Sequence, residues 1–387
     1  MSESSGKKPL KILQVGSGFP GWGGTELHLI NLAEQLTRRG HQVLVAARPG
    51  KFVEQEAQKR NLPTVPLTVQ RQMDFGDSGK FRDLMRREQF DVVHVHWSTD
   101  YIVGPWVAKQ VGVPAVLMSR HSPYPLKSLM GRYLYNRVLF DRIIALSESV
   151  RQTLLGQGLD ADKVVTIHHG TDTEAFRATT KPAAQVRQEW GIPDEAFVVG
   201  LAGRIAEEKG WRVLIEALTL PAVAQRGVRA VLIGDGPEGE LARQMVQERG
   251  LSSRVTFAGF RSDINNAIGA VDVLVLTSTW AEPCAAVVQQ AMALGKPVIG
   301  TNIGGTPEMV ADKETGVLVV SGDAGALGEA IVGLSEDESL RVRMGKAGQV
   351  RVEERFTLRG MTDKNEQLYY TILQSKGKVA IPHAETV

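Results

Sequence analysis

The sequence predicts an α/β protein made of two doubly wound domains. Short runs rich in Val, Ile and Leu recur along the chain and alternate with amphipathic segments in both halves. Strands that are buried on both faces of a parallel sheet have this continuous apolar character. At 387 residues the chain exceeds one ordinary core and suits two domains of about 150–200 residues each.

In the first half, six apolar runs predict strands and the amphipathic segments between them predict helices. The strands are expected at residues 11–15, 42–46, 92–96, 115–119, 142–146 and 164–168, and the helices at 26–38, 51–59, 81–88 and 149–156. The polar stretch 173–182 then follows the last of these strands, which predicts a domain boundary there. We therefore assign residues 1–178 to the first domain.

The second half repeats the pattern, and residues 183–357 are assigned to a second domain. Its strands are expected at residues 198–202, 230–234, 255–258, 271–276, 297–301 and 317–320. A helix of small residues is expected at 285–294, and a mostly charged helix at 358–373. Strand and helix alternating through both halves favours two parallel, doubly wound sheets over an antiparallel architecture.

Composition predicts a water-soluble, cytoplasmic chain. The single cysteine excludes an internal disulfide. The start of the chain offers no apolar segment suited to a signal peptide, and no run approaches the roughly 18 apolar residues of a membrane span. Residues 1–180 carry 23 Lys and Arg against 17 Asp and Glu, a net +6, and the remainder carries 22 against 26, a net −4. This asymmetry fits either contact with an anionic partner such as a membrane surface or a chance imbalance of solvated faces.

The first glycine-rich loop, GSGFPG at residues 16–21, matches G-x-G-x-x-G and follows a predicted strand. In a dinucleotide-binding fold the third glycine lies inside the helix, and an acidic residue roughly 20 positions later binds the ribose. Here Pro20 and the pair Gly23 and Gly24 lengthen the loop, and Arg48 rather than a carboxylate follows the second strand. We therefore prefer a flexible turn whose backbone N–H groups approach a phosphate to a nicotinamide site.

The second glycine-rich loop, GRIAEEKG at residues 203–210, follows the first strand of the second domain and opens a helix. Arg204 offers a planar fork and Lys209 a compact point charge, and a helix start adds a partial charge of about +0.5. Together they could neutralise a diphosphate without a metal. The alternative is a solvated loop in which Glu207 and Glu208 cancel both cations. Placement at the carboxyl end of a strand favours the phosphate site.

The stretch 277–310 reads as acidic loop, helix, strand and Gly-rich loop, and places Glu282 at the end of a strand. Gln290 lies eight residues after Glu282. A glycosidase needs two carboxyl groups, and Gln290 cannot ionise, so the pair is not a hydrolytic dyad. Cys284 lies near a helix start, which lowers a thiol pKa. No His is near in sequence and Ala285 and Ala286 suggest packing, so a nucleophilic role is disfavoured.

Histidines mark two predicted strand ends in the first domain. His121 follows a strand directly, beside Arg120, and we favour a catalytic or substrate contact for it over a structural role. His94 and His96 alternate on one strand face. Zinc would require at least one more ligand of suitable geometry, so we interpret this pair as one core and one site-lining histidine. No metal site is predicted.

Residues 124–142, YPLKSLMGRYLYNRVLFDR, interleave basic residues with Leu, Met and Tyr. A basic amphipathic helix of this kind lies on anionic membrane surfaces. An ordinary helix with one buried face has the same pattern. Both interpretations remain open at this point.

Taken together, the motifs resemble family 4 of the glycosyltransferases over nearly the whole chain. They are GGTE at 23–26, SRH at 119–121, HGTD at 169–172, GRIAEEKG at 203–210, IGDGPE at 233–238, Glu282 with its helix, and GKPVIGTNIGGTPE at 295–308. The resemblance implies the GT-B fold, in which two Rossmann-like domains face each other across a cleft, and retention of anomeric configuration. It also implies that the C-terminal helix, residues 358–375, crosses back onto the first domain.

The resemblance also assigns roles. Arg204 and Lys209 resemble the clamp on the donor diphosphate, Glu282 the contact to donor sugar hydroxyls, and His121 the histidine near the reacting centre. The backbone of Gly24, with Gly23 beside it, is similar to the family's phosphate-contacting loop. The remaining expected donor-binding positions are Gly203, Phe260 in the base-binding turn, Cys284, Ala285, Ala286 and Gln290.

Two positions depart from the family pattern. The pattern is E-x7-E, with the second carboxylate accepting both ribose hydroxyls, whereas this chain has Gln290. A carboxylate acceptor is roughly twice as strong as a neutral one, so a change in donor affinity or identity is expected. The glycine usual three residues after the first glutamate is Ala285, which crowds the approach to phosphate.

From these residues we predict a hexosyltransferase-like enzyme. It would move a sugar from a nucleotide diphosphate sugar to a hydroxyl on a saccharide or lipid-linked acceptor, with retention and with neither metal nor cofactor. Nucleic acid is not expected as a partner. The resemblance alone implies polysaccharide, lipopolysaccharide or glycolipid synthesis. The basic N-terminal domain suggests peripheral contact at the inner face of a membrane. The alternatives are a GT-B sugar-nucleotide epimerase or hydrolase, and a catalytically silent sugar-nucleotide-binding subunit, which Gln290 would favour.

Overall fold

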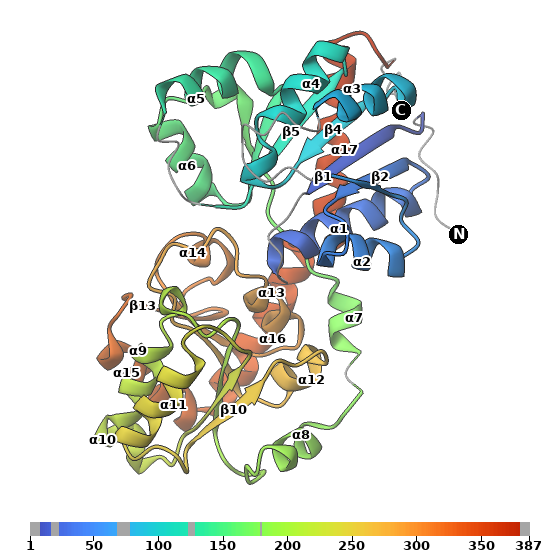
Figure 1. Cartoon of the computed structure of the whole chain (residues 1–387). Coiled ribbons are helices and arrows are strands. Elements are labelled where there is room, and N and C mark those ends of the chain that lie inside the picture. The colour runs from blue at the N-terminus through green and yellow to red at the C-terminus, as the bar shows by residue number, and fades with distance from the viewer. Residues whose placement is uncertain (1–7, 17–22, 68–77, 123–127, 179, 380–387) are drawn as a thin grey trace, which may run out of the picture. The chain divides into compact units, whose positions relative to one another are not determined.

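The computed structural model describes residues 8–16, 23–67, 78–122, 128–178 and 180–379. By its internal contacts the chain divides into two compact units (Figure 1). Unit 1 comprises residues 1–169 and 358–387, and unit 2 comprises residues 170–357. Each is an α/β unit with its own parallel sheet, which confirms the predicted fold class.

Within the described residues, the sheet of unit 1 has seven strands in the order β3-β2-β1-β4-β5-β6-β7. The strands are β1 (Lys11–Gly16), β2 (Gln42–Ala47), β3 (Thr64–Pro66), β4 (Val92–Val95), β5 (Ala115–Arg120), β6 (Arg142–Ala145) and β7 (Val164–Thr166). The helices and turns are α1 (Gly24–Arg38), α2 (Phe52–Lys59), α3 (Ser78–Glu88), η1 (Ser98–Asp100), α4 (Val103–Val111), α5 (Leu129–Tyr133), η2 (Leu134–Leu139), α6 (Glu148–Gly156), η3 (Ala161–Lys163) and α17 (Leu358–Ser375). Strand order reverses between β1 and β4, where both strands end at one edge of the sheet.

The described sheet of unit 2 has six strands in the order β10-β9-β8-β11-β12-β13. They are β8 (Val198–Ala202), β9 (Arg229–Ile233), β10 (Val255–Gly259), β11 (Val273–Leu276), β12 (Val298–Thr301) and β13 (Gly316–Val319). The helices and turns are α7 (Thr173–Arg177), α8 (Ala183–Glu189), η4 (Glu207–Lys209), α9 (Trp211–Thr219), α10 (Pro221–Gln225), α11 (Gly239–Glu248), α12 (Ile264–Gly269), α13 (Ala286–Ala293), α14 (Thr306–Met309), α15 (Ala324–Glu336) and α16 (Glu338–Arg355). Its order reverses between β8 and β11.

The sheet of unit 2 is buried on both faces, as its continuous apolar strands predict. Along β8, Val199 and Leu201 pack into one hydrophobic cluster with Trp211 of α9. Val198 packs into a second cluster with Met292 of α13. Because alternate residues of a strand point to opposite faces, the two clusters lie on the two sides of the sheet.

The last helix, α17, belongs to unit 1 although unit 2 precedes it in the chain. The Tyr370 hydroxyl donates to the Lys8 carbonyl at 2.7 Å, and the Tyr369 hydroxyl lies 2.7 Å from His94 Nδ1 of β4. Gln14 Nε2 of β1 donates to the same Tyr369 hydroxyl at 3.3 Å. The helix α17 therefore contacts β1 and β4, which are neighbours in the middle of the sheet of unit 1 (Figure 1).

Two elements of unit 1 were not predicted, and one segment differs from its prediction. The strand β3 has only three residues, ends in Pro66 and pairs only with β2 in the described sheet, as expected of a proline confined to an edge strand. The helix α4 carries Gly104 and Pro105 in its first turn, which obscures its pattern, although proline is tolerated there. The segment 124–142 is helical only over its described residues 129–139, because Arg142 begins β6.

Candidate active site

The candidate residues of unit 2 follow strands at the carboxyl edge of its sheet. The loop from Gly203 to Gly210 follows β8, and Asp235 follows β9. Phe260 follows β10, and the loop containing Glu282 follows β11. Ligands of open α/β sheets bind beyond this edge, where strand order reverses. That reversal lies between β8 and β11, so Arg204, Lys209 and Glu282 flank it.

Two hydrogen bonds to backbone carbonyls join the loop after β8 to the loop after β11. Thr277 Oγ1 donates to the Lys209 carbonyl at 2.9 Å, and the Thr279 N–H donates to the Glu208 carbonyl at 3.0 Å. Gly210 has φ +65°, and a Cβ there would lie 1.9 Å from the Thr277 carbonyl oxygen. Only glycine allows this approach, which fixes the position of Lys209 relative to β11.

We expect Gly210→Ala to destabilise unit 2. A left-handed conformation costs a residue with a Cβ about 1–2 kcal/mol, and the clash with the Thr277 carbonyl adds to it. Urea unfolding of the full chain should show a loss of at least about 1 kcal/mol. Gly239→Ala is the matched control, because a Cβ at Gly239 meets nothing within 4 Å. Equal stability of the two variants would contradict the packing described here.

Both cations of the loop pair with carboxylates. Arg204 pairs with Glu208, and its side chain is 64% exposed. Lys209 Nζ lies 2.8 Å from Glu282 Oε1, with the two side chains 26% and 15% exposed. The sequence left open that Glu207 and Glu208 cancel both charges, but Lys209 pairs across to Glu282 instead. An exposed pair such as Arg204–Glu208 is weak, so an incoming dianion can displace the carboxylate.

Glu282 is held by three kinds of contact at the end of β11. The Ser278 hydroxyl donates to its carboxylate, and Lys209 donates to the same oxygen. The Glu282 carbonyl accepts the N–H of Gly305 at 2.7 Å. Gly304 has φ +59°, and a Cβ there would lie 2.5 Å from the Glu282 carbonyl oxygen. The two loops of the acidic stretch are therefore packed backbone against backbone.

The residues around the start of α13 include the predicted donor-binding positions. Ala285 is the N-cap and is 5% exposed, Ala286 begins the helix, and no described side chain caps it. Gln290 is half-buried in the second turn. Cys284 is half-buried and accepts from Gln289 Nε2 at 3.2 Å. The Met309 sulfur lies 3.6 Å from the Cys284 sulfur, so the thiol packs against residues of α13 and α14, and its expected contact with the donor stays a prediction.

The turn after β10 is anchored by the loop after β9. The Phe260 N–H donates to Asp235 Oδ2 at 3.0 Å, and the Gly234 N–H donates to the Gly259 carbonyl at 2.8 Å. The Phe260 side chain is 57% exposed. An exposed aromatic on a fixed turn is suited to contact a flat base.

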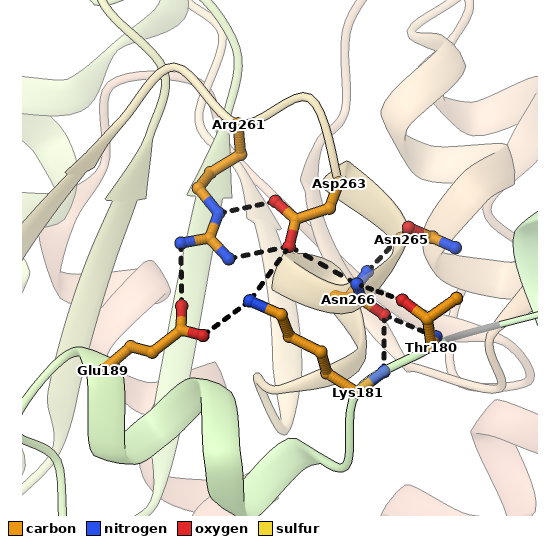
Figure 2. Close-up of polar contacts among 7 residues, drawn as sticks. All are labelled: Thr180, Lys181, Glu189, Arg261, Asp263, Asn265 and Asn266. Atoms are coloured by element: carbon orange, nitrogen blue, oxygen red, sulfur yellow. Dashed lines mark hydrogen bonds and ion pairs between the residues drawn. The ribbon is translucent and has the colours of Figure 1, made fainter.

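A network of ion pairs and hydrogen bonds stabilises the residues that follow Phe260 (Figure 2). Arg261 donates to both carboxylate oxygens of Asp263 at 2.8 Å and to Glu189 at 3.0 Å. Lys181 Nζ donates to Glu189 at 2.6 Å, and Asn266 Oδ1 accepts the backbone N–H of Lys181 at 3.2 Å. Because Arg261 is committed to two carboxylates, its charge is structural rather than available to a phosphate.

In unit 1, the glycine-rich turn leads into α1. Gly23 is the N-cap and Gly24 the first helical residue; residues 17–22 of the turn lie outside the described residues. A Cβ at Gly23 would lie 2.9 Å from Glu26 Oε2. Glu26 is 3% exposed, and burial raises its pKa to about 7. This carboxyl therefore titrates near neutral pH at the very turn that we expect to meet a phosphate.

Five histidines gather at the carboxyl edge of the first sheet. His94 lies in β4 and His96 directly after it, His121 follows β5, His169 follows β7, and His28 lies in α1. Burial lowers the pKa of His94 and His121 to about 3 and that of His169 to about 4. It also lowers the pKa of His28 and His96. All five imidazoles are therefore neutral at neutral pH.

The structure brings His121 together with His96, one of the pair interpreted as core and site-lining, and with His28, to which the sequence assigned no role. His96 Nδ1 lies 3.3 Å from His121 Nε2, and His28 Nδ1 lies 3.1 Å from His169 Nδ1. His169 stood in the HGTD motif, so its position at a strand end was available from the sequence. His28 lies in a helix, and only its place at the start of α1, just past β1, could have signalled it.

Comparisons with known proteins agree with this arrangement. Residues 183–351 match the family described as Glycosyl transferases group 1, and residues 22–175 match Glycosyltransferase Family 4. The lipopolysaccharide core biosynthesis glycosyltransferase LpsE of Rhizobium meliloti is 29% identical over 89% of this chain and 95% of its own length. The N-acetyl-alpha-D-glucosaminyl L-malate synthase of Bacillus anthracis is 24% identical over 95% of this chain and 100% of its own.

Solved structures give the same result. The Anabaena protein HepE in complex with UDP superposes with a TM-score of 0.83 at 25% identity, covering 94% of this chain and 100% of that chain. The same protein has been solved with UDP-glucose. With both sheets, both families and the strand-end residues in agreement, the chain belongs to glycosyltransferase family 4 and is a glycosyltransferase with the GT-B fold.

Proposed function

We propose that this enzyme transfers a sugar from a nucleotide diphosphate sugar to a hydroxyl acceptor with retention and without a metal ion. The observation that carries the proposal is the pairing of Lys209 with Glu282 where the strand order of unit 2 reverses, with Arg204 in the same loop as Lys209. Two cations at one sheet edge supply the charge that a departing diphosphate needs. A carboxylate next to them can accept hydrogen bonds from sugar hydroxyls.

The reaction that this arrangement supports has a simple balance. The bond between the anomeric carbon and the diphosphate oxygen breaks, and its electron pair stays on the diphosphate. The acceptor hydroxyl oxygen forms the new bond to that carbon on the same face. Its proton passes to the freed β-phosphate oxygen, so no side-chain base is required. Arg204 and Lys209 act by stabilising the charge that develops on the leaving group.

Lys209 pairs with Glu282 and Arg204 pairs with Glu208. On donor binding, each cation would exchange its carboxylate for phosphate oxygens. When Lys209 turns toward a diphosphate, the Glu282 carboxylate keeps its bond from Ser278 and becomes free to accept from a sugar. His121, neutral because burial lowers its pKa to about 3, can donate or accept one hydrogen bond at the acceptor side.

The donor is the first thing to identify. A thermal-shift screen against UDP-, GDP- and ADP-sugars is the direct measurement, because a ligand at 100 times its Kd adds about 2.7 kcal/mol to stability. UDP-glucose is the first candidate, since HepE has been solved with it. Product analysis with and without acceptor then follows. Turnover of the donor alone would favour the epimerase or hydrolase, and binding without turnover across an acceptor panel would favour the silent subunit.

Gln290→Glu is expected to tighten donor binding severalfold. A carboxylate accepts hydrogen bonds about twice as strongly as a neutral amide, and Gln290 is half-buried four residues into α13. Calorimetry with the identified nucleotide measures the change. Gln244→Glu in α11 is the control, since that glutamine pairs with Glu248 on the surface. Unchanged or weaker affinity of the Gln290 variant would show that this side chain does not meet the ribose.

We also propose contact of unit 1 with an anionic membrane surface. In α5, Leu129, Met130 and Tyr133 are 76%, 65% and 59% exposed. Arg132 lies among them, and α5 has no buried residue. Among the described residues, no helix combines the length and apolarity needed to cross a bilayer. Co-sedimentation with vesicles that contain anionic lipid, and not with zwitterionic vesicles, would support the contact. Binding to neither would contradict it.

A further inference from the structure

Three of the five clustered histidines of unit 1 lie close together, in an arrangement that sugar transfer does not require. His28 lies with its ring centroid 5.6 Å from that of His96 and 4.9 Å from that of His121, and the His96 and His121 centroids are 5.6 Å apart. The three side chains can offer one nitrogen each such that all three atoms lie within 4.8 Å of one another. His28 and His96 are each 1% exposed, whereas His121 is half-buried, which leaves a path from solvent.

The spacing of the nitrogens fits one metal ion. Around a tetrahedral zinc ion with Zn–N bonds of about 2.1 Å, neighbouring ligand atoms lie about 3.4 Å apart. His96 Nδ1 and His121 Nε2 are 3.3 Å apart. One of these two nitrogens must donate a hydrogen bond to the other. When a metal binds, that proton moves to the second nitrogen of the same ring, and both lone pairs can then face the metal.

The neighbours of His96 fix which nitrogen is free. Its Nε2 lies 2.7 Å from Gln14 Oε1, and the other end of that amide donates to the Tyr369 hydroxyl. An amide oxygen can only accept, so Nε2 carries the proton and Nδ1 has the lone pair. Histidines that bind metals almost always donate their second nitrogen to such an acceptor.

His28 offers the second observation. Its Nδ1 lies 3.1 Å from His169 Nδ1, but its buried Nε2 has no hydrogen-bond partner in the described part of the chain. If His28 Nδ1 donates to His169, then His28 Nε2 keeps a lone pair that accepts no hydrogen bond in the described part of the chain. A buried polar atom without a partner is costly. A bound cation would satisfy it.

We propose that His28, His96 and His121 bind one divalent first-row transition-metal ion, of which Zn²⁺ is the representative. Three neutral imidazoles suit Zn²⁺, Ni²⁺ or Cu²⁺ rather than Mg²⁺ or Ca²⁺, which prefer carboxylate and water oxygens. From the sequence, His94 and His96 alone were too few ligands for zinc. In the structure His96 lies with His28 and His121 instead of His94 in the group of three. His94 instead contacts the Tyr369 and Ser119 hydroxyls.

The site is separate from the diphosphate clamp, which lies in unit 2, so it is compatible with leaving-group stabilisation that needs no metal. An ion on His121 removes the nitrogen that would meet the acceptor. Added Zn²⁺ is therefore expected to inhibit transfer, reversibly with a chelator, and this expectation alone rests on the proposed function. Binding itself is tested without donor or acceptor.

The test uses the full chain, without an affinity tag, in metal-free buffer. Titration with CoCl₂ should give the visible absorption of tetrahedral Co²⁺, and equilibrium dialysis with ZnCl₂ should give one ion per chain. His28→Gln and His121→Gln should each weaken binding at least tenfold. Gln14→Leu should weaken it by about 10- to 100-fold through the orientation of His96. His168→Gln, a histidine outside the group, is the matched control and should bind normally.

Folding of each variant is checked by far-UV circular dichroism and by the thermal shift that nucleotide binding produces through unit 2. Folded variants at His28 and His121 that bind the ion as tightly as the native chain would overturn the proposal, as would a native chain that takes up less than half an equivalent. Failure of the transferase proposal would leave the dialysis result unaffected, so the two outcomes are distinguishable.

Discussion

Replacing Arg204 or Lys209 with alanine is expected to lower kcat by on the order of 10²–10³. Both side chains follow β8, and hydrogen bonds from the Thr277 hydroxyl and the Thr279 N–H hold their loop against the end of β11. Removing a preorganised donor from a developing anion costs that much because no other group moves in to replace it. Initial-rate kinetics with the identified donor and acceptor give the measurement.

The controls are chosen on the same unit. Arg226→Ala removes an exposed arginine at the end of α10, which precedes β9 and so lies by the opposite edge of the sheet. Lys346→Ala removes an exposed lysine of α16. Both should keep near-native turnover. If the Arg204 and Lys209 variants turned over as fast as these controls, the diphosphate assignment would be wrong.

Replacing Glu366 with glutamine is expected to destabilise unit 1 by about 2 kcal/mol. Glu366 of α17 lies 3.6 Å from His41 Nε2 and accepts from Arg39 at 2.6 Å. These contacts lower the pKa of Glu366 to about 2, and the contact with His41 has the largest effect. The shift from 4.5 corresponds to about 3 kcal/mol at most, and solvent at the edge of the pair reduces this.

The same contact predicts how stability depends on pH. A carboxyl whose folded pKa lies below its ordinary value contributes fully above the ordinary value. The contribution should therefore be complete above pH 4.5 and lost as the pH falls from 4.5 toward 2. The Glu366→Gln variant should lack this part of the acid dependence.

Hydrogen exchange of α17 peptides, with urea unfolding of the full chain, measures both effects. Exchange isolates unit 1 where a two-unit chain need not unfold in a single step. Glu240→Gln, an exposed position in α11, is the control. Protection of α17 that is the same in both variants would show that Glu366 does not hold the helix.

The fold was predictable because its strands carry their own signal. A strand such as β8, apolar at every position, can be stable only inside a sheet covered on both faces. The elements that sequence reasoning missed carry no such signal. Three-residue β3 is too short to show a period, and Gly104 and Pro105 interrupt the pattern of α4.

The donor-side candidates were predictable because a glycine-rich loop and its cations are adjacent in sequence. Arg204 and Lys209 both lie in the eight-residue GRIAEEKG loop. The partners of these cations were not predictable in the same way, since Lys209 meets Glu282 through the pairing of β8 with β11. The five clustered histidines come from α1 and from the ends of β4, β5 and β7. Only the folded sheet brings His28 beside His121.

The helix α17, the last one within the described residues, has a consequence for biosynthesis. Tyr369, Tyr370 and Glu366 contact residues that the ribosome made more than three hundred positions earlier. Domains generally fold as units while translation continues at about 5–20 residues per second. Unit 2 is one continuous segment and can close on its own while the N-terminal sheet waits, lacking α17, for roughly 10–40 seconds. During that interval the surface that α17 covers in the folded unit stays exposed, and exposed apolar surface on a partly folded chain favours aggregation.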